Sequence, residues 1–342
     1  MRIGLLLPHS GPAGVWRLGG QACAMLAATE DADGPPADLI GLDCGETVES
    51  AAAAAYALRE RHGVEIVVGM QPSHQRNAIT RALAGEVAYI YTPQYEGGWC
   101  GPGTIPLGVT DAEAAAPSIA WLARKRGISR WFFVGNDYIW PRAAYSVVAG
   151  TIEAVGGSVV GSGFVPFGNS DYDIILSRIR RSRADGVVVV LLGDESIRFH
   201  RAFADADLAR RAARFCLGCE ETLLWALDGH EAEGLYACQP YFTSADDTGR
   251  EGILAAYNAL FGDAMPPVTS MTMGLYDGVR LARTIGHAAG GADRRAIATM
   301  VRSGFDRAAA LSMLKIARSG RTQMPLRIGE ADGPSFRSER LA

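Results

Sequence analysis

Aromatic, hydroxyl and amide side chains gather in three short stretches of this chain. The stretches are "GMQPSH" (69–74), "YTPQYEGG" (91–98) and "GNDYIWPR" (135–142). An aromatic ring with a polar edge can enclose a small apolar group and still donate a hydrogen bond. Hydroxyl and amide groups can match the polar atoms of a small molecule that is removed from water. The residue types therefore favour recognition of a small ligand.

The sequence favours ligand binding by these residues over a catalytic role. Ser73 has no G-x-S-x-G turn around it, and neither a general base nor a lysine accompanies Cys219. An amidase that uses Cys219 with Glu220 or Glu221 is a distant alternative. We predict no catalytic residue and no enzymatic activity.

The sequence also does not predict a cofactor site. The stretch "SGPAGVWRLGG" (10–20) supplies glycines but neither G-x-G-x-x-G nor a phosphate-binding lysine. The six histidines lie far apart, and the C-x-x-C of Cys216 and Cys219 has no second pair. We expect reduced, structural thiols and neither a metal nor an organic cofactor.

Strands that alternate with helices must position these residues. Apolar runs such as "IGLLL", "EIVVG" and "GVVVVLLG" are continuous, as expected for parallel strands that crossover helices cover on both faces. Helices are predicted over 17–30, 48–62, 73–84, 111–127, 139–155, 171–183, 194–207, 248–261, 271–289 and 294–303. Short strands are predicted near the C-terminus at "SMLKIA" and "PLRIG".

Two successive α/β blocks predict two similar three-layer lobes with parallel sheets, joined by a hinge that the chain crosses more than once. We expect residues 1–116 and 243–315 to form the N-terminal lobe, and residues 117–242 and 316–342 to form the C-terminal lobe. Ligands of open parallel sheets bind beyond the carboxyl ends of the strands. The polar and aromatic stretches occupy such loops, so we expect a ligand in the interlobe cleft.

The composition is that of a globular protein with ample apolar residues. Among 342 residues 48% are hydrophobic, and the formal net charge of -4 comes without a long run of like charge. This pattern argues against a nucleic-acid surface. No stretch approaches the roughly 20 apolar residues of a membrane span. We expect a cytoplasmic location, or a periplasmic one if a signal peptide has been removed.

Five stretches of the chain resemble one protein family. They are "VVGMQPSHQRNAI" (67–79), "YIYTPQYEGG" (89–98), "FVGNDYIWPR" (133–142), "EGLYACQPYFTS" (233–244) and "GLYDGVRLARTIGHAAG" (274–290). They resemble the type I periplasmic-binding-protein fold family, in the amide- and urea-binding branch of the branched-chain amino acid receptor group. Within that branch they resemble the amide-sensing negative regulators of aliphatic amidase operons. The match after about residue 305 is weak.

The resemblance implies a set of ligand-binding residues. Ser73, Tyr91 and Tyr95 would line the cleft from the first lobe, and Tyr138 and Trp140 from the second. Ser73 suits a ligand carbonyl, while Glu221, or backbone carbonyls of residues 91–95, suits an NH2 group. A glutamate would equally hold an α-ammonium group. The predicted site comprises Gln71, Ser73, Tyr91, Thr92, Pro93, Tyr95, Tyr138, Trp140 and Glu221.

Two positions depart from the pattern of the amide regulators. Gln71 stands where those proteins tend to have an aromatic residue. The stretch "YTPQYEG" replaces "YPTPYEG", which moves Thr92 by one position. Both positions belong to the predicted site, so the ligand need not be acetamide.

Several of these side chains also have a structural interpretation. Ser73 precedes an apolar-periodic stretch and would serve as a helix N-cap, which is compatible with a ligand contact. Asp137 is expected to cap the helix that starts near Ile139. Trp140 and Tyr89 could equally be core residues.

We therefore predict a sensor whose lobes close on a short aliphatic amide, on urea, or on an amino-acid-like molecule. By resemblance, it would sequester an RNA-binding antiterminator protein until an inducer releases it. The alternative is the solute receptor of an ABC importer for amides, urea or branched-chain amino acids, with an ABC permease as its partner. Neither alternative involves direct contact with nucleic acid or insertion into a membrane. The sequence does not decide whether the protein is a monomer or a homodimer.

Overall fold

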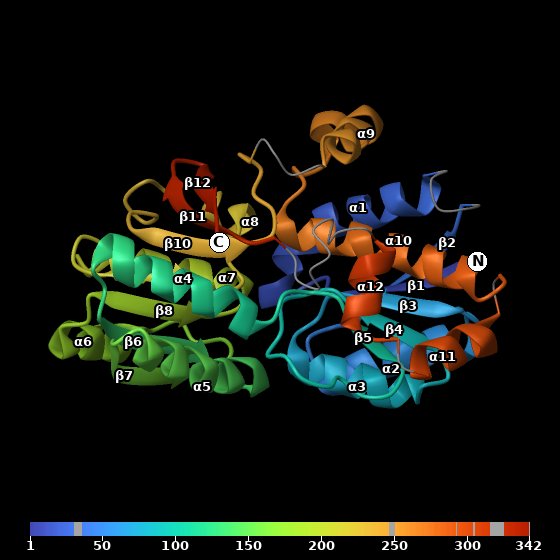
Figure 1. Cartoon of the computed structure of the whole chain (residues 1–342), viewed down its shortest axis with the longest axis horizontal. Coiled ribbons are helices and arrows are strands. Elements are labelled where there is room, and N and C mark those ends of the chain that lie inside the picture. The colour runs from blue at the N-terminus through green and yellow to red at the C-terminus, as the bar shows by residue number, and fades with distance from the viewer. Residues whose placement is uncertain (31–35, 246–249, 292, 304, 315–324, 342) are drawn as a thin grey trace. The chain divides into compact units, whose positions relative to one another are not determined.

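The chain forms two compact units, each assembled from separate segments (Figure 1). The computed structural model describes residues 1–30, 36–245, 250–291, 293–303, 305–314 and 325–341. Unit 1 comprises Met1–Pro93, Gly98–Gly108 and Thr248–Met324, and unit 2 comprises Gln94–Gly97, Val109–Asp247 and Pro325–Ala342. The predicted two-lobed α/β organisation is thereby confirmed.

The sheet of unit 1 has five parallel strands in the order β2-β1-β3-β4-β5. The strands are β1 (Arg2–Leu7), β2 (Asp38–Asp43), β3 (Ile66–Gly69), β4 (Ala88–Tyr91) and β5 (Thr104–Pro106). Every residue of β3 and β4 is buried, because helices cover both faces of a parallel sheet. The continuous apolar runs of the sequence therefore identified these strands.

Helices cover the two faces of the unit 1 sheet, with α1 and α10 on one side and α2 and α3 on the other (Figure 1). A Cβ on Gly20 would lie 2.5 Å from Leu275 Cδ1, so the absence of that Cβ lets α1 and α10 pack closely. The helices of this unit are α1 (Arg17–Thr29), α2 (Val48–Glu60), α3 (Ser73–Leu83), α9 (Glu251–Phe261), α10 (Ser270–Ala288), α11 (Arg294–Arg302), α12 (Arg307–Met313) and the 3-10 turns η1 (Pro12–Trp16) and η3 (Gly262–Ala264).

The sheet of unit 2 has seven strands in the order β12-β11-β10-β9-β8-β6-β7. Five of them are parallel: β6 (Arg130–Asn136), β7 (Ser158–Val165), β8 (Gly186–Val190), β9 (Ala213–Cys216) and β10 (Leu235–Gln239). The helices are α4 (Asp111–Arg126), α5 (Ile139–Ala154), α6 (Asp173–Ser182), α7 (Gly193–Asp205) and α8 (Glu221–Leu224).

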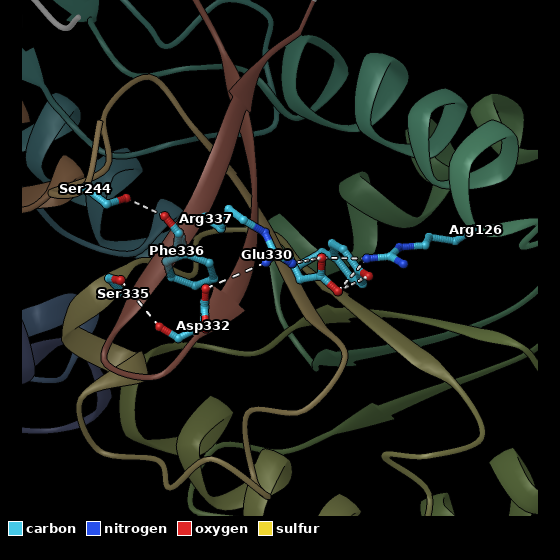
Figure 2. Close-up of polar contacts among 8 residues, drawn as sticks. Arg126, Ser244, Glu330, Asp332, Ser335, Phe336 and Arg337 are labelled. Carbon is cyan, nitrogen blue, oxygen red and sulfur yellow. Dashed lines mark hydrogen bonds and ion pairs between the residues drawn. The ribbon is translucent and has the colours of Figure 1, made fainter. Parts of the chain in front are cut away.

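The second sheet is parallel as predicted, except at the edge that includes the strand predicted at "PLRIG" (325–329). Strands β11 (Arg327–Asp332) and β12 (Ser335–Arg340) form a hairpin, and β11 pairs antiparallel with β10. Figure 2 shows how its side chains anchor it: Arg126 of α4 reaches Glu330, and Ser244 donates a hydrogen bond to the carbonyl of Phe336. A two-stranded hairpin needs only a short turn, so no crossover helix follows.

The chain passes repeatedly between the two units. Three of the passes follow one another closely in the sequence, because residues 94–97 belong to unit 2 while residues 98–108 return to unit 1. Helix α4 lies wholly in unit 2, so the expected change of lobe at 116/117 falls within that helix. Thr110 begins α4 through a capping box with Glu113.

Three local predictions differ from the structure. Pro72 occupies the N-cap of α3 and Ser73 is its first helical residue. Asp137 does not cap α5, because Tyr138 holds the N-cap position and the Asp137 carboxylate instead accepts a 2.8 Å hydrogen bond from Arg142. The run "SMLKIA" begins inside α12, not in a strand, and its residues from 315 on lie outside the described part of the chain.

None of the helices in the described residues is both long enough and apolar enough to cross a membrane.

Candidate ligand-binding site

The predicted residues of unit 1 follow two neighbouring strands. β3 and β4 pair in parallel, so their carboxyl ends meet at one edge of the sheet. Gln71 and Ser73 follow β3, while Tyr91, Thr92 and Pro93 end or follow β4. The structure therefore brings these five residues to one region, at the edge where open parallel sheets bind ligands.

Gln71 is buried and connects the ends of β1 and β4 by hydrogen bonds. Its amide nitrogen donates to the carbonyl of Leu6 at 2.5 Å, and its side-chain oxygen accepts a 2.6 Å bond from the Tyr89 hydroxyl. The Tyr91 hydroxyl donates to the Gln71 carbonyl at 2.8 Å. Burial raises the pKa of Tyr89 well above its ordinary value, so this hydroxyl keeps its proton and remains a donor. Both polar atoms of the Gln71 side chain are thus occupied within unit 1.

Thr92 and Pro93 are fixed by close backbone approaches. The Thr92 hydroxyl donates to the Gly69 carbonyl at 3.3 Å. A Cβ on Gly278 of α10 would lie 2.8 Å from Thr92 Cγ2, and one on Gly108 would lie 1.9 Å from the Pro93 carbonyl oxygen. Because these glycines have no Cβ, α10 and the segment at Gly108 can pack directly against the loop after β4 and fix its position. Ser73 is 2% exposed at the start of α3.

In unit 2, a buried carboxylate joins the loop that carries Tyr95 to Trp140. Asp111 accepts a 2.9 Å bond from Gln94 and 3.0 Å bonds from the Trp140 indole nitrogen. The Asp111 backbone nitrogen also donates to the Tyr95 carbonyl at 2.9 Å. Burial raises the pKa of Asp111 to about 7, although the bonds from Trp140 and Gln94 oppose the rise. Asp111 was not among the predicted residues, because a single aspartate at a helix start carries only a capping signal.

Three aromatic rings of unit 2 form a cluster beyond the ends of β6 and β7. The ring centroids of Tyr138 and Phe167 are 5.0 Å apart, and those of Tyr138 and Trp140 are 6.4 Å apart. Phe167 is 41% exposed and Trp140 only 6%. Phe167 was not among the predicted residues, although it closely follows the apolar end of β7. The rings can enclose an apolar group.

A network of side chains fixes the loops that follow these strands. Asn136 donates to one carboxylate oxygen of Glu195, and the backbone nitrogen of Gly168 donates to the other. The Asn136 side-chain oxygen accepts a 2.9 Å bond from the Leu192 nitrogen. This network joins the loops that follow β6, β7 and β8. It also fixes the backbone at Gly168, the residue that follows Phe167.

Glu221 begins α8 and is fully buried. One carboxylate oxygen accepts bonds from the Thr243 nitrogen at 2.6 Å and from the Thr243 hydroxyl at 3.0 Å. The other oxygen, Oε2, has no hydrogen-bond partner among the described residues. Burial, together with the neighbouring Glu220 charge, raises the pKa of Glu221 to about 7. A buried carboxylate oxygen of this kind can receive an NH donor from a ligand. Thr243 was not predicted.

The arrangement around Cys219 does not favour nucleophilic chemistry. Its thiol is fully buried, and the Cys216 thiol, burial and the charges of Glu220 and Glu221 raise its pKa well above the ordinary value. A thiol of that kind is a poor nucleophile at neutral pH. Among the residues that the structure describes, no group of histidine, cysteine and carboxylate side chains could hold a metal ion.

Comparison with known proteins agrees with this architecture. A family model described as "Periplasmic binding protein" matches residues 1–335. A solute-binding protein of an ABC transporter from R. palustris, solved with 4-hydroxybenzoate, shows 19% identity and a TM-score of 0.82, with 99% of this chain and 95% of that chain covered. A leucine-binding protein from Thermotoga maritima shows 16% identity and a TM-score of 0.81, with coverage of 99% and 97%.

A third solved structure is the branched-chain amino acid transporter substrate-binding protein of Streptococcus pneumoniae in complex with isoleucine. It shows 14% identity and a TM-score of 0.80, and the match covers 99% of both chains. Likeness at these identities establishes the fold. With the family match over nearly the whole chain, it follows that this chain belongs to the periplasmic binding protein family and has the type I fold.

Proposed function

We propose that the protein is a solute-binding component of an ABC importer, and that its ligand is a small molecule with a primary amide or an ammonium group. Support comes from the family and from the solute-binding proteins that share the fold. The ABC permease would be its partner, and the protein would be located outside the cytoplasmic membrane. The ligand would contact loops at the carboxyl ends of parallel strands.

The single observation that carries this proposal is the Glu221 carboxylate. It is fully buried, and its Oε2 atom lacks a partner among the described residues. Leaving such a group unsatisfied costs about 1–3 kcal/mol or more, so a ligand that supplies an NH donor gains affinity. Both an α-ammonium group and an amide NH2 supply one, whereas benzoate does not.

The second candidate is the cytoplasmic amide sensor that acts on an RNA-binding antiterminator. The pairing of "YTPQYEGG" with "GNDYIWPR" favours it, because the amide-sensing regulators carry similar stretches. The two candidates share a ligand class and differ in partner, so the ligand is the first quantity to determine.

Thermal unfolding against a ligand panel tests the proposal. The panel contains leucine, isoleucine, valine, acetamide, propionamide, butyramide, formamide, urea and 4-hydroxybenzoate. A ligand at a hundred times its dissociation constant stabilises the folded protein by about 2.7 kcal/mol and raises the midpoint by several degrees. We expect a shift with amino acids or with short amides, and calorimetric titration of the active compound then gives its affinity.

Matched variants decide the role of Glu221. We expect Glu221→Gln to weaken amino-acid binding about tenfold or more, because an amide cannot neutralise an ammonium group. Glu233→Gln, a change of the same type at a half-exposed carboxylate, serves as the control. A response to 4-hydroxybenzoate alone that is unchanged in Glu221→Gln would contradict the proposed ligand class. No response to the whole panel would also contradict it.

A further inference from the structure

The interior of unit 2 holds a chain of polar side chains that ends on a cysteine. Arg214 is fully buried, and its Nη1 lies 3.1 Å from His200 Nδ1. His200 Nε2 lies 3.3 Å from the Ser196 hydroxyl, and that hydroxyl lies 3.5 Å from Cys216 Sγ. None of the contacts described for the ligand site uses these four side chains.

The direction of these hydrogen bonds follows from the chemistry of arginine. A guanidinium can only donate, so His200 Nδ1 must accept and the imidazole proton must be on Nε2. The Nε2–H group then donates to Ser196, whose hydroxyl is left to donate to the sulfur. Burial and the Arg214 charge lower the pKa of His200 well below its ordinary value, which keeps the ring neutral. Cys216 therefore accepts at the end of this chain of side chains, and its thiol, when protonated, can donate to the Leu217 carbonyl at 3.9 Å. A thiolate fills the acceptor role best.

The charge of Arg214 supports the same conclusion. Its other bonds go to the backbone carbonyls of His200, at 3.4 Å, and Glu233, at 2.6 Å. Among the described residues no carboxylate forms an ion pair with its guanidinium, although the charges of Glu233 and Glu231 act on it from a greater distance. A buried charge without a counterion is costly. The Cys219 thiol, Ser196 and the Arg214 charge together outweigh burial and lower the pKa of Cys216.

The backbone also places the second cysteine within reach. Leu217 and Gly218 form a turn between Cys216 and Cys219, and the φ of 78° at Gly218 lies in the left-handed region that glycine adopts readily. The first and fourth Cα atoms of a β-turn lie within about 7 Å, and a disulfide usually spans about 4.4–6.8 Å. The C-x-x-C pair can therefore close without a large backbone movement.

We propose that Cys216 and Cys219 are a peroxide-reactive dithiol that oxidises to an intramolecular disulfide. The Cys216 thiolate attacks one oxygen of hydrogen peroxide; an S–O bond forms, the O–O bond breaks, and hydroxide leaves. In the sulfenic acid Cys216 no longer carries the negative charge that helps to raise the pKa of Cys219 in the reduced pair. The Cys219 sulfur then displaces hydroxide from the Cys216 sulfenic acid, an S–S bond forms, and the Cys219 proton leaves with that hydroxide as water. The two sulfurs together lose two electrons and the peroxide is reduced. Both thiols are fully buried, so a small oxidant suits the site better than glutathione disulfide.

Differential alkylation of the full chain tests this proposal. Folded protein is treated with hydrogen peroxide at pH 8, its fold is checked by circular dichroism, and thiols are alkylated under denaturing conditions before and after reduction. We expect Cys216 and Cys219 to become protected together and dithiothreitol to restore both. Cys238 is the internal control, because it is equally buried in β10 and burial raises its pKa to about 12.

The expected difference between the two thiols is large. The pKa of Cys216 is lowered while burial raises that of Cys238 to about 12, so at pH 8 Cys216 has much the larger thiolate fraction. Lower intrinsic nucleophilicity of the more acidic thiol offsets part of this, which leaves a rate at least about tenfold higher. Cys216 oxidation no faster than that of Cys238, or oxidation without the disulfide, would overturn the proposal.

Two variants locate the chemistry. Cys219→Ser should stop the reaction at the sulfenic acid, which dimedone traps on Cys216. Ser196→Ala keeps both thiols and should slow the oxidation severalfold, because it removes the donor to the Cys216 sulfur. Equal rates in Ser196→Ala and the wild type would contradict the role of the hydrogen-bond chain. These measurements need no ligand, so their outcome is independent of the proposed function.

Discussion

Asp111 and Trp140 lie 29 positions apart in the chain and share a pair of hydrogen bonds in unit 2. Burial raises the pKa of the carboxyl to about 7 from an ordinary value of 3.8. The folded protein therefore holds this proton more tightly than the unfolded chain does. The resulting contribution to stability is complete below about pH 4 and is lost as the pH rises towards 7.

Replacing the carboxyl should remove this dependence on pH. We expect the free energy of unfolding of Asp111→Asn to rise relative to that of the wild type between pH 4 and pH 8, by up to about 4 kcal/mol. Urea unfolding at unit intervals of pH measures the difference. Parallel pH profiles for the two proteins would show that Asp111 titrates as it does in the unfolded chain.

The indole of Trp140 can be tested against a matched tryptophan. Trp140→Phe removes the donor to a buried carboxylate, whereas Trp131→Phe removes an indole nitrogen that has no partner among the described residues. Both side chains are buried. We expect Trp140→Phe to cost about 1–3 kcal/mol more than Trp131→Phe at pH 8, with a smaller gap at pH 5 where Asp111 is protonated. Equal costs in urea unfolding at both pH values would assign Trp140 a packing role alone.

At the scale of elements, the loop after β4 depends on a close approach between two backbone segments. A Cβ on Gly108 would lie 1.9 Å from the Pro93 carbonyl oxygen, and neither atom belongs to a side chain that can rotate away. We expect Gly108→Ala to destabilise unit 1 by about 3 kcal/mol or more. Gly150→Ala in α5 is the control, because nothing lies within 4 Å of its added Cβ and alanine favours a helix by about 0.5–1 kcal/mol. Thermal unfolding compares the two, and a tolerated Gly108→Ala would show that the loop can move.

The C-terminal hairpin depends on Glu330 (Figure 2). This carboxylate contacts Arg126, Arg337 and the Tyr236 hydroxyl, the last at 2.7 Å. Burial alone would raise the pKa of Glu330, but the bonds from Tyr236 and Arg337 and the charge of Arg126 outweigh it and lower the pKa. The stability that this group contributes is present above its ordinary value of 4.5 and is lost as the pH falls through the lowered value.

We therefore expect Glu330→Gln to destabilise the protein by about 1 kcal/mol at pH 7, a modest value because solvent partly screens the pair. The difference should shrink at pH 3, where the wild-type carboxyl approaches protonation. Asp332→Asn is the control, since that carboxylate is 64% exposed and lies 3.8 Å from Arg337. Denaturant unfolding at both pH values measures the effect, and a penalty that grows with acidity would contradict the assigned sign.

At the scale of the whole molecule, the last residues of the chain complete a sheet that begins nearly 200 residues earlier. Ile328 and Phe336 are buried, and the Phe336 ring lies 4.9 Å from that of Phe242. Deletion of residues 325–342 should expose these groups and leave β10 as an edge strand. At about 1.5–3 kcal/mol for each buried apolar side chain, we expect a loss of about 5 kcal/mol.

A shorter deletion separates this effect from a general intolerance to truncation. Removal of residues 341–342 leaves both strands of the hairpin intact and should lower stability only slightly. Binding of a hydrophobic dye and the thermal midpoint report on both proteins. Equal midpoints for the two deletions would show that the hairpin adds little to unit 2.

The sequence by itself determined the two α/β units, the parallel strands and the loops that carry the polar residues. Continuous apolar runs mark buried parallel strands locally, and the carboxyl ends of such strands must share an edge. The ligand roles of Gln71, Ser73, Tyr138 and Glu221 stay predictions.

Only the tertiary structure decided how these residues are held. The bonds from Gln71 to Leu6, from Trp140 to Asp111 and from Thr243 to Glu221 join positions far apart in the chain. The antiparallel hairpin and the chain from Arg214 to Cys216 are also contacts between separate elements. Such contacts leave no periodic pattern in the sequence, because they depend on which elements lie side by side after the sheets have formed.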